Sequence, residues 1–161
     1  MTASLDIRLL SLACCGSEAA GIVRSWRSQD QAAPAGGSTA SVTIPVLVIA
    51  GTITQPMAAS VLRAIAELPP TGRVIVFGVC AASGGPYWDS PVVVEGLRSM
   101  VPGGTGGAAP EGTEGADARV RSLVEEAVVV PGCPPTGVAL ANSMAVVAEQ
   151  NAESPSDGGA G

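Results

Sequence analysis

Residues 42–50 read VTIPVLVIA, and residues 73–79 read RVIVFGV. Both runs are apolar almost throughout and rich in β-branched residues, which is typical of strands buried on both faces. Shorter runs of the same kind occur at 6–13 and 127–130. Helical patterns alternate with these runs, over 18–29, 56–67, about 92–100 and 136–150. The alternation predicts an α/β fold with a doubly wound parallel sheet of about four strands.

The 161 residues fit one domain, which we predict over 1–150 with a loop insertion at about 102–117. The insertion reads PGGTGGAAPEGTEGAD and has no apolar face. A second stretch of small residues, AAPAGGST at 32–39, also predicts a loop. We expect residues 151–161 to form a flexible tail.

The composition excludes several classes of chemistry. The chain has no His and no Lys, and its eight basic residues are all Arg. Ser-His-Asp and Cys-His nucleophiles, His-ligated zinc, phosphate-loop lysines and Schiff-base lysines are therefore excluded within this chain alone. The formal net charge of -6 leaves no basic footprint, so we expect no nucleic-acid partner.

The apolar runs are too short for a membrane span, which needs roughly 18 to 20 residues, so we expect no transmembrane segment in the chain. The start, MTASLDIRLLSLACC, contains Leu-Ala-Cys, which can precede a lipidated cysteine. Asp6, the short apolar run and Ser11 three residues before Cys14 argue against a lipoprotein signal. A cytosolic start is the better interpretation.

The four cysteines carry the main functional signal. Each lies in a Gly- or Pro-rich turn that leaves a predicted strand: Cys14 and Cys15 after the first, Cys80 after the third and Cys133 after the fourth. The carboxyl ends of parallel strands share one edge of the sheet, where open α/β sheets bind ligands. We therefore expect the four thiols to converge and form a metal centre.

The spacing of the cysteines favours a 4Fe-4S cluster over zinc. Structural zinc sites usually use Cys-x-x-Cys knuckles, which the chain lacks, whereas adjacent cysteines can bind two different irons of a cubane. Neighbouring glycines are expected to let backbone N–H groups reach the inorganic sulfides: Gly16, Gly78, Gly84, Gly85 and Gly132. Thiols that merely pack in the core, and disulfides in an exported protein, are the alternatives.

Four motifs resemble the 20 kDa (PSST, or B-type) family of NADH-quinone oxidoreductase (complex I) subunits, which is related to the small subunits of nickel-iron hydrogenases. They are CCGSE at 14–18, VIAGTIT at 48–54, GVCAASGG at 78–85 and VPGCPP at 130–135. The resemblance covers roughly 6–150. It implies a flavodoxin-like fold with one 4Fe-4S cluster on Cys14, Cys15, Cys80 and Cys133.

The same resemblance implies an electron-transfer subunit that passes electrons to quinone in an NADH-quinone oxidoreductase-like complex, with no complete active site of its own. It implies a hydrogenase-large-subunit-like (49 kDa or D-type) partner, quinone at their interface, and a peripheral place at the cytoplasmic face of the cell membrane. The chain has Ala-Ala-Gly at 19–21, where the family usually has a Met-rich helix start. Alternatives are the small subunit of a nickel-iron hydrogenase-like membrane complex and a non-catalytic metal-binding scaffold.

A few other residues have two interpretations each. Tyr87, Trp88 and Asp89 suit a partner interface or packing on the domain itself. Arg24 and Arg27 either lie near the cluster, pair with partner carboxylates, or are solvated.

Overall fold

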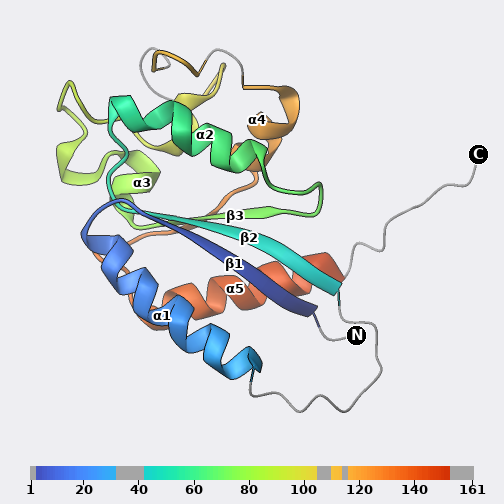
Figure 1. Ribbon diagram of the computed structural model, residues 1–161. Helices are drawn as coiled ribbons and strands as arrows, with labels where there is room; N and C mark the ends of the chain where they lie inside the picture. The colour runs from blue at the N-terminus through green and yellow to red at the C-terminus, as the bar shows by residue number, and fades with distance from the viewer. Residues whose placement is uncertain (1–2, 32–41, 105–109, 114–115, 153–161) are drawn as a thin grey trace, which may run out of the picture.

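The computed structural model describes residues 3–31, 42–104, 110–113 and 116–152 (Figure 1). Within these residues four strands form one sheet: β1 (Ala3–Ser11), β2 (Val42–Ala50), β3 (Arg73–Phe77) and β4 (Val128–Val130), in the order β1-β2-β3-β4. Every neighbouring pair is parallel, and β1 stays in register with β2 from Ala3↔Val42 to Ser11↔Ala50. The predicted parallel α/β sheet is confirmed.

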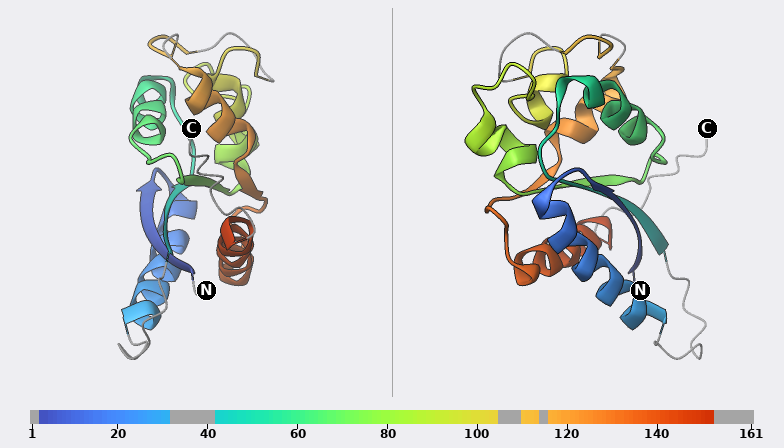
Figure 2. Two further views of the ribbon diagram at one scale, coloured as in Figure 1. Left: turned by 90° about the vertical axis from the view of Figure 1, so that its right-hand side faces the viewer. Right: turned by 60° about the vertical axis from the view of Figure 1, so that its left-hand side comes forward.

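Helices cover both faces of the sheet (Figure 2). Helices α1 (Cys14–Gln31) and α5 (Gly137–Ala152) pack on one face. Helices α2 (Ala58–Ala66), α3 (Val79–Ser83) and α4 (Ala118–Glu125) lie on the other.

Strand β2 contributes side chains to the hydrophobic cores on both faces of the sheet, because successive side chains of a strand point to opposite faces. Val46 and Val48 are buried with α1 and α5, whereas Leu47 and Ile49 are buried with α2 and α4. Both cores are aliphatic apart from Phe77, which is fully buried on the face that α1 and α5 cover. A strand buried on both faces must be apolar at every position, and this is why 42–50 has so few polar residues.

The placement of α1 is informative about the sheet order. The steps β1 to β2 and β2 to β3 run in the same direction, yet α1 and α2 cover opposite faces, so the two crossovers have opposite hands. Parallel crossovers are almost always right-handed, so one of these two departs from the rule if β1 and β2 are consecutive strands of the fold. A flavodoxin-like sheet has the order 2-1-3-4-5, and the four strands here match its positions 1, 3, 4 and 5. No described strand pairs with the outer edge of β1.

The outer edge of β1 is partly covered by a side chain instead. The Arg27 guanidinium on α1 donates a hydrogen bond to the backbone carbonyl of Ile7. A charged side chain on an edge carbonyl opposes pairing with a further strand. Arg27 therefore belongs to the sheet edge, a role that its position in the sequence did not predict.

The predicted helix at about 92–100 is wrong. Val93 is extended and pairs with Thr54, and only a 3-10 turn, η3 (Leu97–Met100), follows. Gly96 has φ of +99°, and a Cβ there would meet the backbone of Ala82, so the chain cannot be helical through this point. Two more 3-10 turns, η1 (Gln55–Met57) and η2 (Gly85–Tyr87), complete the described elements.

Helices α3 and α4 were not predicted. Helix α3 has five residues, and α4 has eight. Helix α4 starts after Asp117, whose carboxylate accepts a hydrogen bond from the Val120 N–H at 2.8 Å. In the predicted insertion, the described residues 102–104, 110–113 and 116–117 contain no helix or strand. The predicted loop at 32–39 lies outside the described residues, and of the predicted tail only 151–152 are described, within α5.

Candidate metal centre

The structure brings the four predicted cysteines to one edge of the sheet. Cys14 and Cys15 form the first two positions of α1, Cys80 lies in α3, and Cys133 lies in the loop between β4 and α5. Figure 1 shows that these three segments meet at the same end of the molecule, because all strands of a parallel sheet point the same way. The adjacent cysteines are in a helical turn rather than an extended segment. Cys14 is exposed and Cys15 is buried, and a hydrogen bond joins their side chains.

Cys15 lies in the middle of this group. The pKa of its thiol is raised from 9.0 to about 11, first by burial and then by the charge of Cys14, a hydrogen bond with Cys14 and the charges of Cys80 and Cys133. All three other thiols therefore act electrostatically on Cys15. The four cysteines are free thiols in this structure, with Cys15 and Cys80 buried and Cys14 and Cys133 exposed.

Two of the sulfur atoms lie directly against glycines. A Cβ on Gly78 would lie 2.8 Å from the Cys15 Sγ, and a Cβ on Gly85 would lie 2.8 Å from the Cys80 Sγ. Both glycines have positive φ, +98° and +58°, which residues with a side chain rarely adopt. A side chain at either glycine would lie too close to a buried sulfur, so the thiol or the turn would have to move.

The backbone N–H groups of three of these glycines have acceptors in the structure. The N–H of Gly16 donates to the Ala13 carbonyl at 2.7 Å, that of Gly78 to Val130 at 2.9 Å, and that of Gly84 to Cys80 at 3.0 Å. These donors are already used within the chain. Of the five glycines, Gly85 and Gly132 remain as candidates for donors to a bound group.

The turns that carry the cysteines are tied together by backbone hydrogen bonds. The Gly78 N–H donates to the Val130 carbonyl, and the Val79 N–H donates to the Gly132 carbonyl at 3.0 Å. These two hydrogen bonds extend the β3–β4 pairing to the loop that holds Cys133. Leu12 likewise donates to Ala50 at 2.8 Å beyond the end of β1. The three cysteine-bearing turns therefore hold fixed positions relative to the sheet.

Gly51 supports the turn that leads from β1 to Cys14. It has φ of +105°, and a Cβ there would collide with the backbone nitrogen of Ala13. The signal was present in the sequence as Gly51-Thr52 at the end of a buried strand. Thr54 precedes η1 without a side-chain cap hydrogen bond.

The donors that this edge of the sheet offers are the four cysteine thiols. Within the described ranges, no group of three or more Cys, Asp or Glu is arranged to hold a metal ion. Four thiolates on one zinc stand about 3.8 Å apart when each Zn–S bond is about 2.3 Å. In a cubane each thiolate binds a different iron, so the sulfurs stand farther apart.

Other singled-out residues lie away from the thiols or on the surface. Tyr87 and Trp88 are exposed, at 55% and 61% of their surface. Arg24 is exposed, and Arg27 reaches the β1 edge. In the part of the chain that the structure describes, no helix is long and apolar enough to span a membrane.

Residues 10–147 match the family model described as NADH ubiquinone oxidoreductase, 20 Kd subunit. The chain belongs to this family. The match includes all four cysteines of the candidate site and both layers of helices, so the expectation drawn from the four motifs is confirmed at the level of the family.

Three curated members of the 20 kDa subunit family share about a third of their residues with this chain, and all three are B-type subunits of NADH-quinone oxidoreductase. The one from Symbiobacterium thermophilum is 34% identical over 104 residues, which cover 65% of this chain and 44% of that protein. Those from Salinispora tropica and Streptomyces griseus are each 35% identical over 95 residues, 59% of this chain and 38% and 31% of those proteins. The matched part is thus less than half of each relative.

A solved structure shares the fold of this 20 kDa family chain at low identity. It is a chain of the membrane-bound sulfane sulfur reductase, an archaeal respiratory membrane complex. The TM-score is 0.57 with 17% identity, over 95% of this chain and 72% of that one. The likeness supports the α/β architecture.

Proposed function

We propose that this chain is an electron-transfer subunit that holds one 4Fe-4S cluster on Cys14, Cys15, Cys80 and Cys133. The observation that carries the proposal is the convergence of four free thiols from three separate turns around the buried Cys15. Iron–sulfur clusters are held by cysteine thiolates, and the chain has no His or Lys to support another centre at this edge. When bound, the cluster supplies one-electron oxidation and reduction.

The chain's own residues then divide into two roles. Cys15 and Cys80, 0% and 1% exposed, hold the inner side of the centre against Gly78 and Gly85 and keep water away from it. Cys14 and Cys133 are exposed and form the outer side. All four thiols must lose their protons to bind iron, and the raised pKa of Cys15 means that its proton stays on sulfur until metal arrives.

For the electron acceptor we propose quinone, at an interface with a hydrogenase-large-subunit-like partner, in a complex bound peripherally at the cytoplasmic face of the membrane. The support is membership of a family whose curated relatives are named as B-type subunits of NADH-quinone oxidoreductase. A second candidate is the small subunit of a hydrogenase-like membrane complex with another acceptor. It is favoured by Ala19, which is fully buried in α1 at a position where the family usually has methionine.

The first experiment is anaerobic purification of the chain with whatever co-purifies, followed by iron and acid-labile sulfide counts. We expect about four of each per chain and an electron paramagnetic resonance signal after reduction. The variants Cys80→Ser and Cys133→Ser should lose both, whereas Ser83→Ala, a change to an exposed side chain between them, should keep both. Zinc without sulfide would contradict the proposal and favour a metal-binding scaffold, and so would a wild-type preparation without metal.

The acceptor is tested separately in the intact complex. After chemical reduction, a water-soluble quinone should reoxidise the cluster and abolish its signal within the turnover time. If the reduced signal survives added quinone but disappears with another acceptor, the chain serves the second candidate function.

A further inference from the structure

A cavity of about 450 Å³ lies beside β4, and none of the four cysteines, all of which are described, lines it. Its deep part is formed by Val76 of β3, Leu97 of η3 and Val124 of α4, which are 2%, 1% and 0% exposed. Ala82 and Ala127 complete this apolar floor. We call the hollow the β4 cavity.

The mouth of the β4 cavity combines one apolar and one charged side chain. Val129 of β4 is 41% exposed, and Arg98 of η3 is exposed. The β3–β4 register pairs Val129 with the buried Val76, so both side chains lie on the face of the sheet that α3 and α4 cover (Figure 1). Among the described residues that line the cavity, Arg98 is the only charged one. The cavity therefore runs from a cationic mouth to an apolar floor.

Arg98 is held at the mouth by the end of α4. Its guanidinium donates a hydrogen bond to the backbone carbonyl of Glu125 at 3.1 Å. This acceptor is a neutral carbonyl, so the bond orients the guanidinium without cancelling its charge, and the guanidinium has further N–H donors. Of the carboxylates at this end of α4, that of Glu126 accepts from the Ser122 hydroxyl at 2.6 Å, and Glu125 lines a separate cavity together with Arg98 and Val101.

The size and polarity of the β4 cavity match those of a binding site for a small molecule. Protein interiors are close-packed, and they contain few voids larger than a water molecule. Ligand pockets have volumes of roughly 300–1,000 Å³, largely apolar walls and a small number of polar groups that orient the ligand. An aliphatic chain is stabilised by an apolar floor, and a guanidinium binds carboxylate and phosphate groups through paired hydrogen bonds.

We propose that the β4 cavity binds an anionic amphiphile, with its single aliphatic chain on the apolar floor and its carboxylate or phosphate head on Arg98. Charge selects this occupant, because Arg98 repels a cationic amphiphile and gains no charge-assisted hydrogen bond from a neutral one. Fatty acids and phospholipids share this chemistry. The inference does not rest on the proposed function, because the cavity and the cysteines are separate.

The test is isothermal titration calorimetry of the full chain, purified anaerobically, with decanoate and separately with decyl phosphate. We expect saturable binding of both, and binding of decanol and of decyltrimethylammonium that is weaker by about tenfold or more. Tighter binding of decanoate would identify a fatty acid as the ligand, and tighter binding of decyl phosphate a phospholipid; either order supports the site. In methyl NMR spectra, the signals of Leu97 and Val124 should shift on binding.

Two pairs of variants locate the site. Arg98→Gln should weaken decanoate binding about tenfold and leave decanol binding unchanged, whereas Arg98→Lys keeps the charge and should keep most of the affinity. Arg121→Gln, at an exposed arginine of α4, is the matched control and should bind like the parent. Val129→Asn should weaken the binding of every amphiphile, and Val138→Asn, at an exposed valine of α5, should not.

Equal losses in Arg98→Gln and Arg121→Gln, equal binding of decanoate and decanol, or the absence of saturable binding would overturn the proposal. So would dimerisation of the chain that Val129→Asn abolishes, because a second copy would then cover the cavity. The thermal midpoint of each variant separates lost binding from lost folding. Iron and sulfide counts on every preparation separate the two proposals: full counts without decanoate binding reject only the amphiphile site.

Discussion

At the residue scale, the glycines beside the buried thiols decide whether the centre can form. Gly78 has φ of +98° with ψ of 152°, a conformation available essentially to glycine alone, and its missing side chain leaves room for the Cys15 sulfur. The constraint is therefore both conformational and steric. Nearby, the N–H of Gly78 bonds to Val130, so the residue cannot move without disturbing the β3–β4 edge.

We predict that Gly78→Ala destabilises the protein by about 1–3 kcal/mol and lowers the iron content per chain. The alanine methyl group would lie within 2.8 Å of the Cys15 Sγ, so the thiol or the turn must move. Chemical denaturation and iron analysis measure the two effects. Gly21→Ala is the matched control, because a Cβ there meets nothing within 4 Å and alanine favours a helix, so stability should stay equal or rise.

A second prediction concerns the accessibility of the thiols in metal-free protein. Iodoacetamide should modify the exposed Cys14 and Cys133 well before the buried Cys15 and Cys80. Mass spectrometry of timed samples at one pH gives the order of modification. Uniform labelling of all four cysteines in the folded chain would show that this edge opens without metal.

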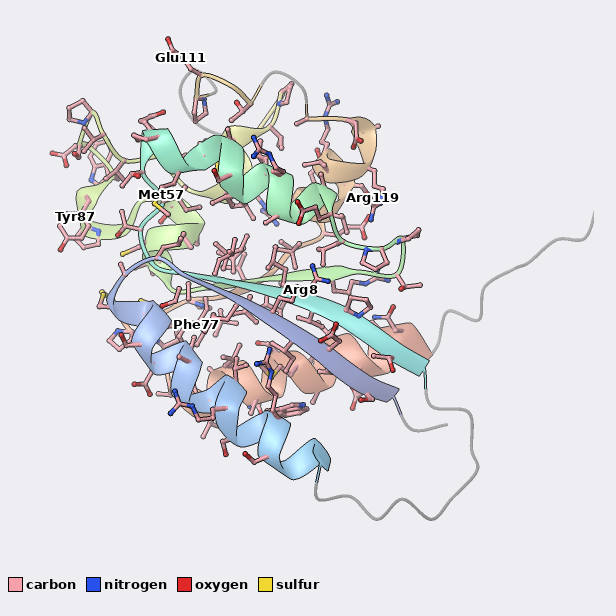
Figure 3. The ribbon with its side chains drawn as sticks, in the orientation of Figure 1. Arg8, Met57, Phe77, Tyr87, Glu111 and Arg119 are labelled. Atoms are coloured by element: carbon pink, nitrogen blue, oxygen red, sulfur yellow. The ribbon has the colours of Figure 1, made fainter. Side chains whose placement is uncertain are left out.

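At the element scale, short helices in this fold depend on their ends and on tertiary contacts. Helix α4 has eight residues, too few to be stable alone in water. Asp117 caps its start, and the guanidinium of Arg119 donates to the carbonyl of Leu68 beyond α2, which joins the two helices on one face of the sheet. Figure 3 shows Arg119 on this side of the molecule.

We therefore predict that Asp117→Ala lowers the free energy of unfolding by about 0.5–2 kcal/mol, because the Val120 N–H loses its acceptor. Urea titration measures the change. Glu111→Ala removes another exposed carboxylate from the same segment and should change stability by less than about 0.5 kcal/mol. Equal effects of the two substitutions would mean that charge, and not capping, stabilises α4.

At the scale of the whole molecule, the cysteines link three turns that no single element holds together. Cys14 and Cys15 follow β1, Cys80 follows β3 and Cys133 follows β4, so a group bound by all four thiols would connect both outer strands with the centre of the sheet. Ligands that bind only the folded state add their binding free energy to its stability.

Removal of iron should accordingly lower the thermal midpoint without abolishing cooperative unfolding, because the two aliphatic cores on either face remain. For a chain of this length each 1 kcal/mol lost corresponds to about 2–4 °C. Scanning calorimetry of loaded and chelator-treated protein measures the difference. An unchanged midpoint would show that the thiols bind no group that stabilises the fold.

The fold and the site were predictable to different extents. The four strands were evident because a strand buried on both faces must be apolar throughout, as in 42–50. The convergence of the cysteines followed from the parallel sheet alone. Helices α3 and α4 were missed because five and eight residues give little periodicity, and the helix predicted at 92–100 was wrong because Gly96 lies against the backbone of Ala82.

The sequence by itself determined the layer architecture, the family and the edge at which the four thiols meet, because these depend on hydrophobic pattern and on the direction of parallel strands. Only the tertiary structure decided which thiols are buried, which glycines press against them and where Arg27 binds. It also decided that Tyr87 and Trp88 face solvent and that Arg98 lies at the mouth of an apolar cavity. These properties depend on distances between residues far apart in the chain, and such distances cannot be inferred from a local sequence pattern.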